Sequence, residues 1–232
     1  MGIYFKIEKK LEHFCIDVEF AFDQGVLAIQ GESGAGKTTV LNCISGLKNP
    51  DKGKIIIGGQ TVFDENCNIP VKKRQIGYLF QNYALFPNMT VGKNIIYGIK
   101  NKPEYKDRAS RAELLDYAEY IMETFGVAHL RKRYPKQISG GEKQRAALAR
   151  AIVTQPRLLL LDEPFSALDM KTKETVYEEF ASFKKELGIP TILITHDPKE
   201  SERFADYRIT MRQGVIVEEQ TADNKCREEK KR

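Results

Sequence analysis

The chain of 232 residues contains no long apolar segment. Apolar runs such as residues 158–161 are far shorter than the about 20 residues that a helix needs to cross a membrane. The first residues also lack the charged and then apolar pattern that is typical of a signal peptide. We therefore expect a soluble protein that is not secreted.

Cysteine is scarce and scattered. The four cysteines are Cys15, Cys43, Cys67 and Cys226, and none of them forms a C-x-x-C pair of the kind found in zinc sites and redox motifs. Two of them sit in apolar surroundings, so we expect thiols in the core rather than disulfides or a metal site. This usage suits a reducing cytoplasm.

No strong surplus of charge marks the sequence either. The formal net charge of +5 is spread along the chain, and a solvated surface explains it as well as nucleic acid or anionic lipid would. No internal repeat or low-complexity linker divides the chain, and 41% hydrophobic residues suffice for a sizeable core. The composition predicts one large domain, or a core with a subdomain, without naming a partner.

One glycine-rich segment fits the phosphate-loop pattern of a glycine, four residues and then Gly-Lys-Ser/Thr. Residues 26–30 before it are a short apolar run of strand type, and the apolar residues after it recur at helical spacing as far as Gly46. The predicted context is therefore strand, loop and helix. The segment consists of Gly31, Glu32, Ser33, Gly34, Ala35, Gly36, Lys37, Thr38 and Thr39.

This loop has the chemistry that a nucleotide phosphate requires. Glycines let successive backbone N–H groups curl around a phosphate, and the helix N-terminus adds the positive end of its dipole. Lys37 would reach the β and γ phosphates, Thr38 would hold Mg²⁺, and Thr39 is a second hydroxyl nearby. A glycine-rich turn that merely caps a helix is the alternative, but the flanking strand and the complete pattern favour the phosphate site.

Strands and helices alternate in the second half of the chain. Residues 158–161 are an uninterrupted apolar segment, which is typical of a strand buried on both faces of a parallel sheet, and residues 191–195 are expected to form another buried strand. Residues 3–22 alternate instead, as in a small antiparallel sheet with one buried face. Residues 107–126 have the pattern of an amphipathic helix.

We accordingly expect an α/β fold: a P-loop nucleotide-hydrolase core with a mainly parallel sheet, an antiparallel β subdomain and a helical insertion subdomain. The expected single domain covers residues 1–220, with the helical subdomain inserted at about residues 82–138. Residues 221–232 contain almost no apolar side chain, and we expect a disordered charged tail there.

Polar residues follow several of the predicted strands. Gln81, Asp162, Glu163 and His196 each stand at the carboxyl end of a strand, which is the edge where α/β sheets bind their ligands. Asp162 could hold Mg²⁺, directly or through water, while Glu163 orients a water toward the γ-phosphate. Taken alone, the acidic pair could also simply end a strand and cap a helix, and His196 could be an ordinary satisfied polar group.

A second glycine pair precedes the helical pattern that runs to Pro156. Ser139 and Glu142 are spaced as a capping box at the start of that helix. Gly140 and Gly141 between them are poor helix formers, and a close backbone approach to an anion would explain both. The capping and the anion-binding interpretations are compatible.

Together these motifs resemble the nucleotide-binding subunit of ATP-binding cassette (ABC) transporters, over nearly the whole chain. In that family they are called the Walker A loop, the Q-loop, the signature, Walker B with its catalytic glutamate, the D-loop and the switch histidine. In chain order they are residues 31–39, Gln81, residues 138–144, residues 158–163, residues 166–169 and His196.

The resemblance implies an ATPase that uses ATP and Mg²⁺. Its catalytic residues would be Glu163, His196 and Gln81, and its metal ligands Thr38, Gln81 and Asp162. The resemblance also implies a head-to-tail homodimer in which ATP lies between the Walker A loop of one subunit and the signature of the other. The nucleotide contacts would be residues 31–39 together with Ser139, Gly140, Gly141, Glu142 and Asp169.

The segment at residues 80–91 looks like the importer branch, in which this region receives a helix of an integral membrane permease. Tyr83, Leu85, Phe86 and Met89 could equally form subdomain core. This resemblance implies a peripheral protein on the cytoplasmic face of the cell membrane, linked indirectly to a solute-binding protein and not to nucleic acid. The details look most similar to molybdate importers, with sulfate, iron and polyamine importers as alternatives.

Two further function classes fit less well. A non-transport cassette ATPase of DNA repair or translation would have a long coiled coil or a second cassette, and a P-loop kinase would leave the signature glycines unexplained. One family feature, the aromatic residue that stacks on adenine, stays open. His13 and Phe14 are nearest, but Phe14 continues the buried alternation of Ile16 and Val18, so we expect it in the core.

Overall fold

The computed structural model describes residues 2–166, 168 and 170–221 and divides into two compact units. The first unit comprises Met1–Ile76, Arg157–Glu163 and Leu187–Arg232, and the second comprises Gly77–Pro156 and Pro164–Glu186. Asp169 and Cys226 lie outside the described residues. Among the described residues, no helix combines the length and the apolar character that a bilayer crossing requires.

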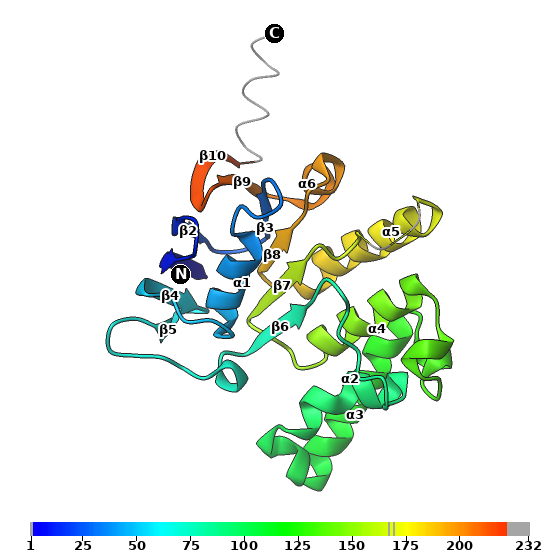
Figure 1. Ribbon diagram of the computed structural model, residues 1–232. Helices are drawn as coiled ribbons and strands as arrows, with labels where there is room; N and C mark the ends of the chain where they lie inside the picture. Colours follow the sequence, from blue (N-terminus) through cyan, green and yellow to red (C-terminus); the bar gives the residue numbers. More distant parts are fainter. Residues whose placement is uncertain (1, 167, 169, 222–232) are drawn as a thin grey trace. The chain divides into compact units, whose positions relative to one another are not determined.

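The first unit is built on a mixed sheet (Figure 1), and within it neighbouring strands follow the order β5-β4-β1-β2-β10-β9-β3-β8-β7. The strands are β1 (Ile3–Lys10), β2 (Cys15–Phe22), β3 (Val26–Gln30), β4 (Lys52–Ile57), β5 (Gln60–Phe63), β7 (Leu158–Asp162), β8 (Thr191–Ile194), β9 (Tyr207–Arg212) and β10 (Val215–Thr221). β10 includes Thr221, the first residue of the expected disordered tail, and the other residues of that tail, 222–232, lie outside the described residues.

The central part of this sheet is parallel, as the sequence predicts. β3 pairs in parallel with β8 and with β9, and β7 pairs in parallel with β8. Every residue of β7 and β8 is buried, which explains the apolar runs at residues 158–161 and 192–194. Parallel pairing places the carboxyl ends of β3, β8 and β7 at one edge, where the functional residues of the first unit follow.

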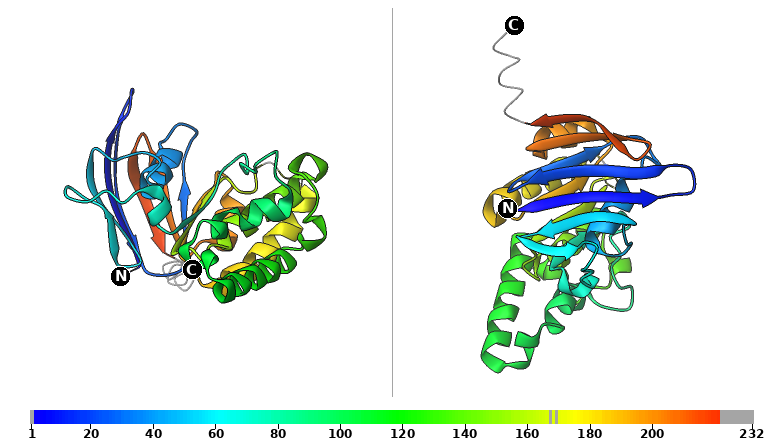
Figure 2. Two further views of the ribbon diagram at one scale, coloured as in Figure 1. Left: turned by 90° about the horizontal axis from the view of Figure 1, so that it is seen from below. Right: turned by 90° about the vertical axis from the view of Figure 1, so that its left-hand side faces the viewer.

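The antiparallel part contains β1, β2, β4 and β5. β1 pairs antiparallel with β2 and with β4, and β4 pairs antiparallel with β5; Figure 2 shows the blue and cyan strands side by side. Phe5 and Ile7 in β1, and Ile16 and Val18 in β2, are buried at alternate positions. The predicted α/β fold with parallel and antiparallel strands is therefore confirmed.

Two helices complete the first unit, α1 (Lys37–Ser45) and α6 (Pro198–Phe204). α1 packs against β1 and β7. It ends at Gly46, whose φ of 83° is a left-handed conformation that glycine adopts at no steric cost, so the predicted helix stop is correct.

The carboxyl end of α1 is held by a buried arginine. Arg74 is 2% exposed, and its guanidinium donates hydrogen bonds to the carbonyl oxygens of Cys43 (3.0 Å), Ile44 (2.8 Å) and Ile69 (2.8 Å). The last carbonyls of a helix have no partner within the helix, and a cation there also complements the helix dipole. Arg74 therefore joins the end of α1 to the turn η1 (Val71–Lys73).

The second unit is mainly helical. Its helices are α2 (Val91–Lys100), α3 (Arg108–Thr124), α4 (Gly140–Ile152) and α5 (Met170–Leu187), with the short turns η2 (Pro103–Lys106), η3 (Ala128–Leu130) and η4 (Pro135–Gln137). The strand β6 (Ile76–Leu79) spans the boundary between the two units. α4 packs against α2 and α3, and α3 matches the amphipathic helix that the sequence predicts at residues 107–126.

The expectation that the cysteines are core thiols is correct for only one of the described cysteines. Cys43 is buried in α1, and this burial raises the pKa of its thiol to about 11. Cys67 is partly exposed, and Cys15 is exposed because its side chain faces outward in β2. All three are free thiols, as expected.

We predict that Arg74→Met destabilises the protein by about 2–4 kcal/mol, because it leaves buried carbonyl oxygens without a donor. Lys73→Ala removes an exposed cation one residue earlier and is the matched control, with an expected effect within about 0.5 kcal/mol. Urea unfolding at equilibrium measures both variants. Equal midpoints for the two variants would contradict the role of Arg74 as the cap of α1.

Candidate functional site

The loop between β3 and α1 has the backbone of an anion site. Gly31, Gly34 and Gly36 have φ values of 143°, 83° and 101°, in the region that favours glycine. A Cβ on Gly31 would lie 2.2 Å from the carbonyl oxygen of Met211, so no side chain fits there. Gly36 is the N-cap of α1 and supplies no side-chain hydrogen bond, so the first N–H groups of the helix depend on another acceptor.

Lys37 places a cation inside this loop. Its side chain is 7% exposed, and Nζ donates hydrogen bonds to the carbonyl oxygens of Gly31 (2.7 Å) and Glu32 (2.8 Å). Burial lowers the pKa of Lys37, and the nearby carboxylates of Glu163 and Asp162 oppose this shift. An anionic group bound at the loop would add charge that favours the protonated amine.

Thr38 and Asp162 bring two oxygen ligands together. Thr38 Oγ1 donates a hydrogen bond of 3.3 Å to Asp162 Oδ1. Asp162 closes the buried strand β7 and is only 6% exposed, and this burial raises the pKa of its carboxyl group, opposed by the hydrogen bond from Thr38. A cation would relieve the cost of burying this carboxylate.

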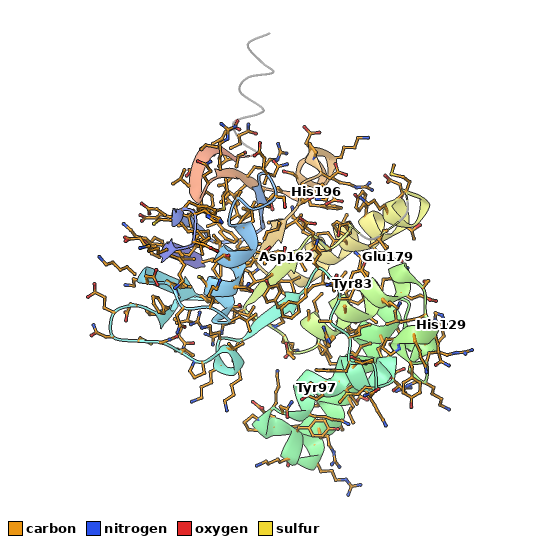
Figure 3. All side chains as sticks on the ribbon, viewed as in Figure 1. Tyr83, Tyr97, His129, Asp162, Glu179 and His196 are labelled. Carbon is orange, nitrogen blue, oxygen red and sulfur yellow. The ribbon has the colours of Figure 1, made fainter. Side chains whose placement is uncertain are left out.

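Glu163 and His196 face each other beyond the ends of β7 and β8. Glu163 has a φ of 46°, and its backbone N–H donates to the carbonyl oxygen of Ile194 (3.1 Å), which fixes the turn after β7. Its Oε2 lies 3.7 Å from His196 Nδ1, and the two side chains are 23% and 64% exposed. Figure 3 shows His196 and Asp162 at the same edge of the sheet. The predicted grouping of Asp162, Glu163 and His196 is therefore present within the first unit.

The expectation that Phe14 belongs to the buried face of β2 is wrong. β2 begins at Cys15, and Phe14 is only partly buried. A Cβ built on Gly36 would lie 3.5 Å from Phe14 Cε2, so this ring borders the phosphate loop. The periodicity of the sequence could not show this, because the position of Phe14 depends on where the hairpin between β1 and β2 turns.

The capping box at the start of α4 is present. Ser139 Oγ accepts a hydrogen bond from the N–H of Glu142 (3.3 Å), and Glu142 Oε2 accepts one from the N–H of Ser139 (2.7 Å). This backbone N–H is the main reason that the pKa of the Glu142 carboxyl group is lowered. Gly140 is exposed and Gly141 is buried. The capping interpretation is confirmed, and anion binding by these glycines stays a prediction.

The remaining predicted site residues either belong to the second unit or lie outside the described residues. Gln81 lies in an exposed turn after β6, and residues 139–142 start α4; both segments belong to the second unit. Their place beside the phosphate loop stays a prediction. Asp169 lies outside the described residues.

Comparisons with known sequences all indicate the same protein family. A family model described as ABC transporter matches residues 16–166. The chain is 40% identical to the molybdate/tungstate import ATP-binding protein WtpC of Archaeoglobus fulgidus, over 94% of this chain and 86% of that protein. It is 42% identical to the molybdenum import ATP-binding protein ModC of Haemophilus influenzae, over 84% of this chain and 53% of that protein.

A further relative is named for the import of a different solute. The sulfate/thiosulfate import ATP-binding protein CysA of Ralstonia nicotianae is 41% identical over 86% of this chain and 53% of that protein. The chain thus spans about half the length of ModC and of this CysA. Among solved structures, a dimeric ATP-binding cassette in a post-hydrolysis state, bound to ADP and Pi, has a TM-score of 0.77 at 27% identity, covering 94% of this chain and 98% of that chain.

We predict that Lys37→Ala weakens the binding of ATP by about 10²-fold or more, because no other side chain of the loop supplies a cation for the phosphates. Lys48→Ala, an exposed lysine just beyond the other end of α1, is the matched control and should bind ATP normally. Isothermal titration or fluorescence with a nucleotide analogue measures both affinities. Parent-like binding by Lys37→Ala would contradict the phosphate site.

Proposed function

Because the chain belongs to the ABC transporter family, we propose that it is the ATP-hydrolysing subunit of an importer that takes up a small solute. The observation that carries this proposal is the cluster in the first unit: a buried lysine within a glycine loop, a hydroxyl–carboxylate pair, and a glutamate facing a histidine. Phosphate binding, metal binding and activation of water are the functions that ATP hydrolysis requires.

The resident cation would be Mg²⁺, held by Thr38 and Asp162. The described residues contain no cluster of three or more carboxylate, histidine or cysteine side chains that could hold a metal by itself. Mg²⁺ commonly keeps several waters and takes one or two carboxylates plus substrate phosphates, so a hydroxyl and one carboxylate suit it. When bound, Mg²⁺ would neutralise charge on the β and γ phosphates. Gln81 is a proposed additional ligand.

Glu163 is the proposed general base. Its carboxylate is partly exposed, so a water can reach it, and the fixed turn after β7 aims it beyond the sheet edge. A general base must lie within hydrogen-bond reach of the water whose proton it takes. His196, whose Nδ1 lies 3.7 Å from Glu163 Oε2, would orient the same water or contact the γ-phosphate. Lys37 would meanwhile hold the phosphates against the loop.

We further propose that hydrolysis occurs in a head-to-tail homodimer. The solved structures that resemble this chain include two dimeric cassettes, one of them with ADP and Pi bound. In such a dimer, Ser139, Gly140, Gly141 and Glu142 would contact the ATP held by the other subunit, and Asp169 would lie nearby. The hydrogen-bonded Ser139–Glu142 box would then fix the start of α4 in the form that meets the nucleotide.

The loop at residues 83–90 is the proposed contact with membrane permease subunits. Tyr83 and Ala84 have left-handed φ values of 58° and 45°, which side chains rarely adopt. Arg150 of α4 donates hydrogen bonds to the carbonyl oxygens of Ala84 (2.6 Å) and Tyr83 (2.8 Å), and fully buried Asn94 bonds both the N–H and the carbonyl of Phe86. The loop is thus held in one shape by side chains of α4 and α2.

This loop presents aromatic surface. Phe86 is 38% exposed and Tyr97 is 43% exposed, and their ring centroids are 4.8 Å apart. Tyr83 is instead 7% exposed and belongs to the core of the second unit. Exposed aromatic residues on a rigid support are typical of protein–protein contacts. A subunit of this kind would work on the cytoplasmic face of the membrane, with the solute-binding protein attached through the permease.

The proposed solute is molybdate or a related oxyanion such as tungstate. This choice is supported by the printed names of WtpC and ModC, while the similar CysA keeps sulfate as the alternative. The solute does not touch the ATP-hydrolysing subunit in this scheme, so no described side chain selects it. Uptake assays with the complete transporter would decide between the oxyanions.

The main test is Glu163→Gln, which keeps the shape of the side chain but cannot accept the proton of the attacking water. We expect hydrolysis to fall by about 10²-fold or more and an ATP-bound dimer to accumulate. Size-exclusion chromatography with and without Mg-ATP, together with phosphate release, measures both effects. The exposed residue Glu65 provides the control Glu65→Gln. A Glu163→Gln protein that stays monomeric in ATP and hydrolyses it at the parent rate would exclude Glu163 as the base.

A second prediction concerns the permease contact. Phe86→Ser should abolish solute uptake by the complete transporter while ATP binding and the melting temperature of the isolated subunit change little, because Phe86 is exposed. Tyr120→Ser is the control, since Tyr120 is an exposed aromatic residue (45%) of α3. Loss of folding in Phe86→Ser would show that this ring is core, and normal uptake would show that the loop does not contact the permease.

A further inference from the structure

His196 stands between two residues that are anchored by their neighbours. Thr195, the residue before it, is 1% exposed, and its backbone N–H lies 3.4 Å from the carbonyl oxygen of Ile29 at the end of β3. Thr195 Oγ1 accepts a hydrogen bond from the N–H of Asp197 (3.0 Å), so it closes a tight turn around His196. The imidazole itself remains exposed.

A buried carboxylate completes this turn. Glu200, in the first turn of α6, is 3% exposed, and its Oε2 accepts a hydrogen bond of 2.5 Å from Thr195 Oγ1. A glutamate on a helix is usually solvated, because burying a carboxylate costs free energy unless hydrogen bonds compensate. Burial of the Glu200 carboxylate therefore requires hydrogen-bond donors, and the hydroxyl of Thr195 is one of them.

The N-cap hydrogen bond of α6 is made by a different carboxylate. The N-cap of the helix is Asp197, whose Oδ1 accepts a hydrogen bond from the N–H of Lys199 (2.9 Å). Glu200 contacts a side chain of the preceding strand end. Thr195 is thereby fixed by three elements, namely β3, the turn at residue 197 and α6, while the next residue, His196, lies near Glu163.

We propose that Thr195 and Glu200 form a positioning pair that holds His196 in register with Glu163 for hydrolysis. This inference rests on the proposed function, since it assigns the pair a role in the same reaction. Neither residue touches the nucleotide in this scheme. Without the Thr195–Glu200 hydrogen bond, α6 would no longer help to hold the turn at residues 195–197, and the imidazole would be positioned less precisely against the carboxylate.

The test is a double-mutant cycle of Thr195→Val and His196→Ala, assayed as ATP hydrolysis by the full chain. Valine keeps the shape of threonine and removes the hydroxyl. We expect Thr195→Val to lower kcat by about 10-fold or more with KM for ATP changed less than about 3-fold, because a small misplacement of a catalytic group slows the chemical step. Thr195→Ser restores the hydroxyl and should restore kcat. In the His196→Ala background, Thr195→Val should have no further effect.

A matched control lies at the other end of the same strand. Thr191 is also buried (4% exposed), and its Oγ1 donates to the carbonyl oxygen of Ile189 at 2.9 Å, remote in the strand from His196. Thr191→Val should lower the melting temperature without lowering kcat. Should Thr195→Val fail to fold, Glu200→Ala removes the same hydrogen bond from its other partner and takes its place in the cycle.

The outcomes separate this inference from the proposed function. If His196→Ala lowers kcat but Thr195→Val and Glu200→Ala do not, the positioning pair is excluded and the role of His196 stands. If Thr195→Val lowers kcat equally in the presence and absence of the imidazole, the pair acts on stability or on another group and the inference is wrong. If the His196→Ala protein hydrolyses ATP at the parent rate, the role proposed for His196 is wrong, and the positioning role of Thr195 and Glu200 is wrong with it.

Discussion

The burial of the Lys37 ammonium group is the constraint on which the site depends. A cation can be held inside the loop only because carbonyl oxygens of Gly31 and Glu32 accept its hydrogen bonds at 2.7 and 2.8 Å. Those carbonyls point inward because the glycines adopt φ values that other residues avoid. The glycine pattern, the lysine and the start of α1 are therefore one structural solution that suits an anion.

Parallel pairing of β7 with β8 supplies the rest of the site. Because Asp162 pairs with Ile194, the residues that follow each strand emerge side by side, and this brings Glu163 to His196 across a large separation in the chain. The hydrophobic strands thus set the geometry of the polar groups. The carboxylate of Asp162 is forced into a buried position, which favours a bound cation, while Glu163 one residue later remains open to water.

Buried Arg74 and Glu200 and partly buried Arg150 show how charged side chains are used away from the reacting groups. Each makes hydrogen bonds to the ends of helices, loops or strands. A charged side chain can serve several such partners at once, so it fixes segments that no regular secondary structure connects. These hydrogen bonds connect the loops to the helices and strands around them.

The sequence by itself determined the α/β class, the phosphate loop, the capping box and the polar residues at the strand ends, because these are local patterns with a direct physical cause. Only the tertiary structure decided that Phe14 borders the loop, that Cys15 faces outward and that Tyr83 is core while Phe86 is exposed. It also revealed the partners of Arg74 and Glu200. Periodicity specifies which face of an element is buried, whereas these contacts depend on where hairpins turn and which elements pack together, and no local pattern encodes that.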